Sequence, residues 1–152
     1  MSIEDEYEIL SRIELFESLE SVQLKRLIFV SQRYQLQAGE YLFRQNDACN
    51  RVFAILQGEC SVLVNTNHGE IALAVQGVGD LVGEMAAISG EPRNASIRAN
   101  TACEVIGFEA SDFISTVTNH PDTALMMMKI LSERMAILRR QLDTLRNKQL
   151  NQ

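Results

Sequence analysis

Turn-forming residues recur about every ten positions between residues 33 and 108, and this spacing constrains the fold more than any other feature of the chain. The turns are Gly39-Glu40, Gln45-Asn46-Asp47, Gln57-Gly58, residues 65–69, residues 77–80 and Gly90-Glu91-Pro92. Many short strands between evenly spaced turns indicate a β-sandwich, roll or barrel. The clearest strands are residues 51–56, 61–64 and 71–75, and the last two are expected to form a hairpin.

Helical patterns flank the strand-rich region on both sides. The N-terminal region is expected to form two helices, with Ser21 as the cap of the second, and Pro121 is placed to open the last helix. At 152 residues with 46% hydrophobic content, the chain suits one domain with its own core. We therefore expect one mainly β domain over residues 1–152, made of N-terminal helices, a strand-rich body and a C-terminal hinge and dimerisation helix, at residues 1–30, 31–110 and 111–150.

The charge of the chain is acidic overall and unevenly distributed. A net charge of −6 and a pI near 4.9 argue against general binding to nucleic acid, because most of the surface repels phosphate. Acidic residues dominate positions 1–20, whereas basic residues dominate positions 129–148. The basic helix lacks interleaved aromatic residues, so a DNA-associated role is the least favoured function.

Neither metal chemistry nor catalysis is indicated by the residue pattern. Cys49, Cys60 and Cys103 have no short paired spacing, which argues against a zinc site or a disulfide framework and fits a reducing compartment. The two histidines, His68 and His120, are too isolated for a metal cluster. No motif combines a nucleophile, a base and an orienting group, so we expect no enzyme. The acidic start and the lack of a long apolar run predict a cytoplasmic protein without a membrane segment.

Residues 83–96 set Glu84 and Arg93 around a run of small residues. The guanidinium of Arg93 can meet two phosphate oxygens with its planar fork, and the carboxylate of Glu84 can accept a hydrogen bond from a sugar hydroxyl. A short helical turn is expected after Gly83, where free amides favour negative charge. Pro92 restricts the backbone at Arg93, which lowers the entropy lost when the guanidinium is fixed on a ligand. The combination predicts a site for a phosphate attached to a sugar.

The same segment resembles a known family. The pattern Gly-Glu-aliphatic-Ala at residues 83–86, followed by Pro-Arg-x-Ala-Ser at residues 92–96, is similar to the phosphate-binding cassette of cyclic-nucleotide-binding domains. These domains occur in the catabolite activator protein and in kinase regulatory subunits. Residues 38–47, 53–58 and 101–105 also resemble family motifs. The resemblance implies an eight-stranded β-roll flanked by helices, with a cyclic nucleotide as ligand and no other cofactor.

The resemblance also assigns roles to individual residues. It implies that Arg93 binds the phosphate and Glu84 the ribose 2′-hydroxyl. Asn94 offers both a donor and an acceptor, and cyclic AMP is favoured over cyclic GMP. Two positions depart from the family pattern. Asn46 replaces a glycine, and asparagine tolerates the left-handed backbone that glycine adopts there. Val82 replaces an aromatic residue. The predicted ligand-binding residues are Val82, Gly83, Glu84, Met85, Ala86, Ala87, Pro92, Arg93, Asn94, Ala95 and Ser96.

Two functions are consistent with these features. In the first, a standalone sensor binds a cyclic mononucleotide and passes the change through its C-terminal helix to a protein partner. In the second, Glu84 and Arg93 form an ion pair with each other, and the domain is a ligand-free scaffold for dimerisation. Related transcription regulators continue into a DNA-binding helix-turn-helix, which this sequence does not contain, so direct DNA binding is not expected.

Apolar residues recur at three-four spacing in the last helix and are typical of a coiled-coil seam. The seam consists of Met128, Leu131, Met135, Leu138, Leu142 and Leu145. It predicts a parallel homodimer or, because the flanking positions are basic, pairing with an acidic partner helix. In the family this helix caps the base of the bound ligand, and Leu138 and Arg139 are the predicted base-facing residues. The hinge for this movement is expected at residues 113–128.

Overall fold

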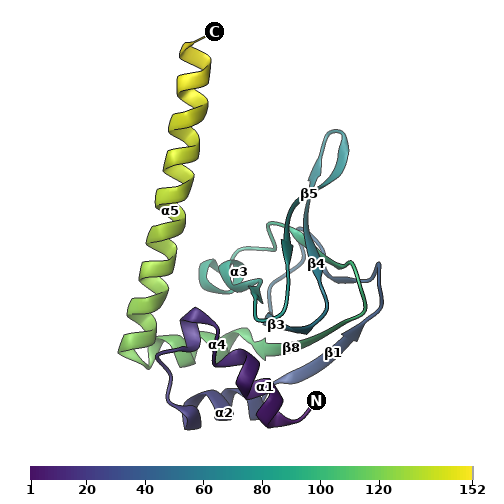
Figure 1. The fold of residues 1–152 in the computed structure, drawn as a ribbon, viewed down its shortest axis with the longest axis vertical. Coiled ribbons are helices and arrows are strands. Elements are labelled where there is room, and N and C mark those ends of the chain that lie inside the picture. Colours follow the sequence, from purple (N-terminus) through teal and green to yellow (C-terminus); the bar gives the residue numbers. More distant parts are fainter. Residues whose placement is uncertain (152) are drawn as a thin grey trace.

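Two packed sheets form a roll, and helices cover one end of it (Figure 1). The computed structural model describes residues 1–151. Its strands are β1 (Gln32–Leu36), β2 (Tyr41–Phe43), β3 (Arg51–Gln57), β4 (Cys60–Thr66), β5 (Gly69–Gln76), β6 (Leu81–Val82), β7 (Ser96–Ala99) and β8 (Cys103–Glu109). The strands pair antiparallel, in the order β1-β8-β3-β6 in one sheet and β2-β7-β4-β5 in the other. The predicted mainly β fold of eight strands is confirmed.

The helical segments lie before, within and after the strands. They are α1 (Ile3–Leu10), η1 (Glu14–Phe16), α2 (Ser21–Phe29), α3 (Glu84–Ser89), α4 (Ala110–Thr118) and α5 (Pro121–Leu150). Pro121 occupies the first turn of α5, as predicted. The cap of α2 is Glu20 and not Ser21, because the main-chain N–H of Glu20 donates to Gln23 Oε1 at 3.0 Å and the helix begins one residue earlier than predicted.

β3 is buried on both faces because it separates two hydrophobic cores. Phe53 and Ile55 face the interior of the roll, where they pack with residues of β4 and β8. Val52, Ala54 and Leu56 face the other way and pack in the core that the helices form. Successive side chains of a strand point to opposite faces, so both faces of this strand need apolar residues. This arrangement explains the continuous apolar run in the sequence.

The first turns of α5 are anchored in the helical core, and the rest of the helix extends past the roll (Figure 1). Met127 is 7% exposed and belongs to that core. The hydroxyls of Thr123 and Ser18 form a hydrogen bond of 2.7 Å, which ties α5 to the N-terminal region. From residue 132 to residue 150 every residue is exposed. The rotation of the helix about its axis is therefore fixed by its first turns.

Two local predictions are confirmed by the backbone. β4 and β5 form the expected hairpin, with Asn67 and His68 between the strands. Asn46 has a φ of 75°, which is the left-handed conformation inferred for this position. Among the described residues, no helix has both the length and the apolar character that a bilayer-spanning segment needs.

Candidate ligand-binding site

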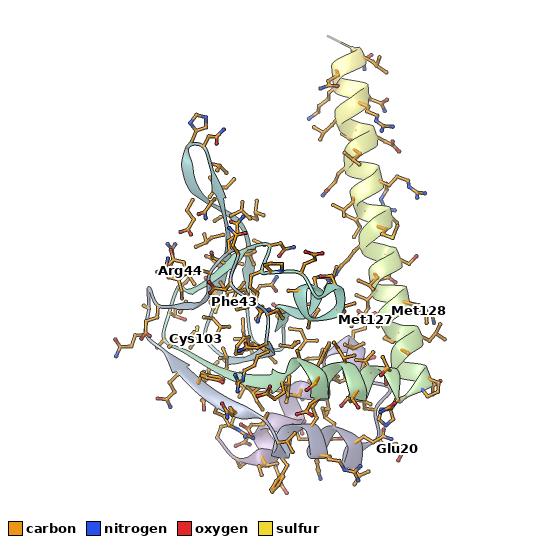
Figure 2. All side chains as sticks on the ribbon, turned by 180° about the vertical axis from the view of Figure 1, so that it is seen from behind. Glu20, Phe43, Arg44, Cys103, Met127 and Met128 are labelled. Carbon is orange, nitrogen blue, oxygen red and sulfur yellow. The ribbon has the colours of Figure 1, made fainter. Side chains whose placement is uncertain are left out.

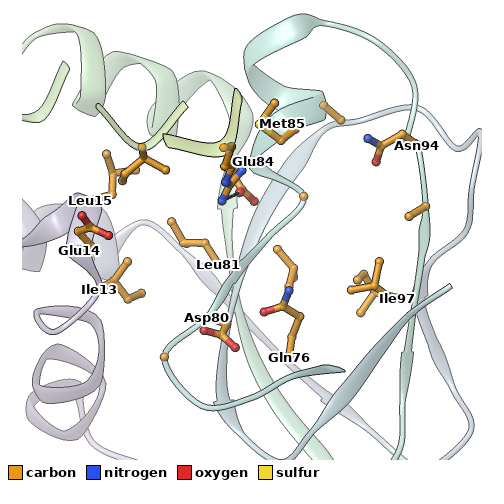
Figure 3. Close-up of a pocket in the computed structure, with 18 of the residues that line it drawn as sticks. Ile13, Glu14, Leu15, Gln76, Asp80, Leu81, Glu84, Met85, Asn94 and Ile97 are labelled. Atoms are coloured by element: carbon orange, nitrogen blue, oxygen red, sulfur yellow. Dashed lines mark hydrogen bonds and ion pairs between the residues drawn. The ribbon is translucent and has the colours of Figure 1, made fainter. Parts of the chain in front are cut away.

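A cavity of about 620 Å³ lies where the roll meets α3, η1 and α5 (Figure 3). Its volume falls within the range of small-molecule sites in proteins. The wall contains the cassette residues Val82, Gly83, Glu84, Met85, Ala86, Arg93, Asn94 and Ala95. The strands of the roll add Phe43, Val62, Gln76 and Ile97. Apolar and polar side chains thus line the same space, as a ligand with a flat base and a charged group would require.

Main-chain hydrogen bonds fix the position of Arg93 in this wall. Its main-chain N–H donates to Asp47 O at 2.8 Å, and its own carbonyl accepts from Asn46 N–H at 2.8 Å. The side chain is 3% exposed, with Nη1 donating to Gly83 O at 2.9 Å and Nη2 donating to Arg51 O at 2.5 Å. The guanidinium carbon lies 3.9 Å from the centroid of the Phe43 ring, which gives a cation–π contact.

The charge of Arg93 has no counter-ion in the described part of the chain. None of the ion pairs between residues 1 and 151 includes Arg93. Its Nε–H is buried and has no acceptor. Burial lowers the pKa of Arg93, while Cys49, Asp47 and Glu84 act in the opposite direction. A buried guanidinium of this kind is suited to binding an anion, because the anion would neutralise its charge and accept hydrogen bonds from its free N–H groups.

The backbone around α3 leaves room for that anion. Gly83 has a φ of 82°, and a Cβ on it would lie 2.3 Å from Arg93 Nη1, so both its conformation and its small size are needed here. Met85 and Ala86 stand in the first turn of α3, where main-chain N–H groups have no acceptor within the helix, and no hydrogen bond from them to another described segment is present. The side chain of Ala86 is small, which keeps the approach to these donors open. The two amides therefore border the cavity that Arg93 also lines.

Glu84 does not pair with Arg93. Its Oε1 accepts a hydrogen bond from Nη2 of Arg134 on α5 at 2.8 Å, and its side chain is 10% exposed. The ion pair that the scaffold hypothesis places between Glu84 and Arg93 is thus absent from the described residues. A carboxylate in this wall can accept a hydrogen bond from a sugar hydroxyl through the oxygen that Arg134 leaves free.

Three predicted site residues lie away from the cavity wall. Ala87 packs in the helical core and Pro92 is exposed. The hydroxyl of Ser96 is turned to the backbone and accepts from Gln45 N–H at 2.8 Å. The other predicted ligand-binding residues all line the cavity. Asn94 and Gln76 both contribute amide groups to the wall. Gln76 was not predicted from the sequence, because it ends β5 and belongs to no recognisable motif.

The residues of α5 that line the cavity differ from the two predicted base-facing residues, whose role stays a prediction. Leu138 is 59% exposed, and neither it nor Arg139 lines the cavity. The α5 residues on the wall are Met127, Ile130 and Arg134, which lie earlier in the helix than the predicted pair. Arg134 was not among the predicted site residues, although its spacing of seven residues from Met127 is a signal that could have identified it.

The predicted seam lies on a neighbouring face of α5. Met128 follows Met127 on the helix but is exposed, as Figure 2 shows for the two adjacent side chains. The other residues of the seam are exposed as well, except for Leu131, which packs partly against the helical core. The exposed ones are Met128, Met135, Leu138, Leu142 and Leu145. An apolar stripe of this length on one helix is suited to pairing with another helix.

The roll, the cassette and the helix at its edge define a regulatory ligand-binding domain. The model of the family described as "Cyclic nucleotide-binding domain" matches residues 33–120. The chain therefore belongs to the cyclic nucleotide-binding domain family, which confirms the resemblance inferred from the cassette. The family and the fold are regulatory and not catalytic.

Relatives of known identity extend this result. A cyclic nucleotide-gated potassium channel of Rhizobium etli is 27% identical over 128 residues, which cover 84% of this chain and 35% of the channel. The chain thus spans about a third of the length of the first curated relatives it matches. Two solved structures confirm the likeness to activator proteins and kinase regulatory domains. The Thermus thermophilus catabolite activator protein has a TM-score of 0.78 at 25% identity, covering 87% of this chain and 62% of that one. The regulatory domain of Toxoplasma gondii PKA, solved with cAMP, has a TM-score of 0.72 at 26% identity, covering 75% of this chain and 44% of that one.

Proposed function

We propose that this domain is a sensor that binds a cyclic mononucleotide in the cavity and transmits the change through α5 to a protein partner. The cyclic phosphate binds Arg93 and the free N–H groups of Met85 and Ala86. The ribose 2′-hydroxyl donates to Glu84. The base lies between the strands of the roll and the first turns of α5, which provide its apolar contacts.

One observation carries the proposal, namely that Arg93 is buried as a cation without a carboxylate partner. Its 3% exposure and its unpartnered Nε–H mean that the guanidinium has lost water without gaining a counter-ion. Such a charge is costly in a folded protein unless a ligand neutralises it. A cyclic phosphodiester carries one negative charge and two free oxygens, so it matches one guanidinium and two neighbouring amides.

We propose cyclic AMP as the preferred ligand. Asn94 and Gln76 present amide groups in the cavity wall, and an amide can both donate to and accept from the edge of adenine (Figure 3). In the family, threonine at the position of Asn94 is associated with guanine and alanine or serine with adenine, and asparagine matches neither of these patterns. The T. gondii regulatory domain, to which the chain is similar, was solved with cAMP. We further propose a cytoplasmic homodimer that forms through the exposed seam of α5.

Isothermal titration calorimetry tests the proposal. The wild-type protein is titrated with cyclic AMP, cyclic GMP and cyclic di-GMP, and so are the variants Arg93→Ala and Arg98→Ala. Arg98 is the matched control, because it carries the same charge on β7 but pairs with Glu70 at 3.6 Å outside the cavity. We expect Arg93→Ala to weaken cyclic AMP binding by at least about 100-fold, as for a buried charge-assisted contact, and Arg98→Ala to change it less than about twofold.

A ligand-free scaffold is the second candidate function, and one observation favours it. Both Nη groups of Arg93 donate to main-chain carbonyls, of Gly83 and Arg51, so the residue also joins the cassette to β3 without a ligand. A scaffold would give no heat with any of the three nucleotides while the wild-type protein remains folded by circular dichroism. That outcome would contradict the sensor and leave a dimerisation role.

A further inference from the structure

Two of the three free cysteines meet in the core of the roll, although they lie 43 residues apart in the chain. Cys60 begins β4 in one sheet, and Cys103 begins β8 in the other (Figure 2). Their Sγ atoms are 3.7 Å apart, and the two residues are 0% and 4% exposed. A disulfide bond is about 2.0 Å long, so the sulfur atoms need to approach by less than about 2 Å to form one. The pair is thus placed to bridge the two sheets.

The turns around Cys103 hold its sulfur beside Cys60. The Sγ atom lies 3.3 Å from Glu59 O and 3.2 Å from Thr101 O, and the thiol can donate to either carbonyl. Gly58 has a φ of 89°, and a Cβ on it would lie 2.7 Å from Cys103 Sγ. The turn between β3 and β4 can therefore close over the sulfur only because this residue is glycine.

The two sulfur atoms differ in their access to small molecules. A second cavity, of about 390 Å³, is lined by Cys103 but not by Cys60. A water molecule occupies about 30 Å³ in the liquid, so this space is large enough for a small oxidant such as hydrogen peroxide. The second cavity shares no residue with the cavity that contains the cassette. Cys103 is therefore the thiol that an oxidant reaches first.

The environment of Cys60 assigns it the second role. Burial raises the pKa of the Cys60 thiol to about 12, and the neighbouring Cys103 and the charge of Glu59 act in the same direction. The thiolate is the form that attacks an oxidant, so Cys60 is a poor first nucleophile at neutral pH. Its sulfur is nevertheless close enough to react with an oxidised Cys103.

We infer that Cys60 and Cys103 form a reversible modification site, a dithiol that hydrogen peroxide oxidises to a disulfide. The sulfur of Cys103 attacks a peroxide oxygen, the O–O bond breaks, and Cys103 becomes a sulfenic acid as one water leaves. The sulfur of Cys60 then attacks the sulfur of Cys103, and the S–O bond breaks. The proton of Cys60 leaves with the hydroxide as a second water. The two thiols lose two electrons, the peroxide gains them, and a thiol reductant reverses the change.

The disulfide would close a loop that contains the whole cassette at residues 83–96 and would join the two sheets covalently. Closing a loop of this size restricts the unfolded chain and stabilises the folded one. We expect the oxidised protein to melt about 10 °C above the reduced protein. Neither cysteine lines the cassette cavity, so the inference does not depend on the proposed function.

Mass spectrometry and thermal unfolding test the inference. Folded wild-type protein is treated with hydrogen peroxide, then unfolded, alkylated with N-ethylmaleimide and mapped by peptide mass. We expect a link between Cys60 and Cys103, a rise of about 10 °C in melting temperature, and the loss of both in dithiothreitol. Cys49→Ala is the matched control, because it removes the third thiol and should leave the link and the rise in melting temperature unchanged.

Variants with one member of the pair test the order of the two steps. In Cys60→Ala the sulfenic acid of Cys103 has no thiol to react with, so dimedone should label it. In Cys103→Ala dimedone should not label Cys60, which the second cavity does not reach. Both variants should be folded by circular dichroism and should show no rise in melting temperature with peroxide.

Three outcomes would overturn the inference. The first is that both thiols of the folded wild type survive peroxide that oxidises free cysteine in the same buffer. The second is a link that forms in urea but not in the folded protein, because the pair would then serve only as small apolar residues. The third is sulfinic acid on Cys103 without a link, because Cys60 would then fail to reach the oxidised sulfur.

Discussion

Replacing Arg93 by methionine separates its role in binding from its role in folding. Methionine is unbranched, apolar and flexible enough to fill the space of the aliphatic stem. If Arg93 is a ligand-binding cation that the empty protein tolerates, Arg93→Met should leave the ligand-free protein close to wild-type stability. If the residue is mainly a structural support, its loss should be strongly destabilising.

The magnitude follows from the contacts of the side chain. The variant loses two hydrogen bonds from a charged donor, to Gly83 O and Arg51 O, worth about 2 kcal/mol each, and a cation–π contact with Phe43 worth about 1 kcal/mol. It gains the relief of a desolvated guanidinium, which is several kcal/mol for a buried ion. Burial lowers the pKa of Arg93, so the folded protein holds this charge less readily than the unfolded chain. The opposing contributions nearly cancel, and we expect the free energy of unfolding to change by less than about 2 kcal/mol.

Urea and thermal unfolding measure this change with and without cyclic AMP. A difference of about 1 kcal/mol shifts the midpoint by about 2–4 °C in a domain of this size. Cyclic AMP at about 100 times its wild-type dissociation constant should stabilise the wild type by about 2.7 kcal/mol and Arg93→Met, with an affinity at least about 100-fold weaker, by no more than about 0.4 kcal/mol. A loss of more than about 3 kcal/mol in the ligand-free variant would refute the reasoning, because Arg93 would then be required for folding itself.

Two further predictions concern the cassette and the seam. Gly83→Ala should weaken cyclic AMP binding by about tenfold or more in calorimetry, because the new Cβ would meet Arg93 Nη1 at 2.3 Å. The control is Gly90→Ala, because Gly90 also has a positive φ but no atom lies within 4 Å of its new Cβ. Equal effects of the two variants would argue against displacement of Arg93. Light scattering should find a dimer at micromolar concentration, and the dimer should become more stable as salt is added. Leu142→Glu should abolish the dimer, because a charge in the seam is costly. A wild-type monomer in both low and high salt would exclude dimerisation through the seam.

The strands and the cassette could be predicted from the sequence because both depend on local patterns of residues. Evenly spaced turns predicted the roll, and the apolar run of β3 followed from its position between two cores. Arg93 and Glu84 were identified from residue types within one short segment, and both lie in the cavity wall. Asn46 was expected to adopt a left-handed backbone, which it does. Each of these features depends on residues close together in the chain.

The contacts that cross the chain could not be predicted in the same way. The partner of Glu84 is Arg134, and that contact depends on how the core anchors the start of α5 through Met127. Leu138 and Arg139 were predicted to face the base from the resemblance to the family, whereas the α5 residues on the cavity wall are Met127, Ile130 and Arg134. Phe43 stacks on Arg93 only because the register of β2 with β7 turns it inward. Periodicity predicts which face of a helix or strand is apolar, but not how far along the element that face packs against the rest of the domain.

In the proposed sensor, a cyclic phosphate neutralises the buried charge of Arg93. Titration of cyclic AMP into folded wild-type protein and folded Arg93→Ala, followed by calorimetry, tests it most directly. We predict saturable binding of one nucleotide per chain in the wild type and a loss of at least about 100-fold in the variant. Equal affinity of the two proteins, or no heat from a folded wild type, would contradict the claim.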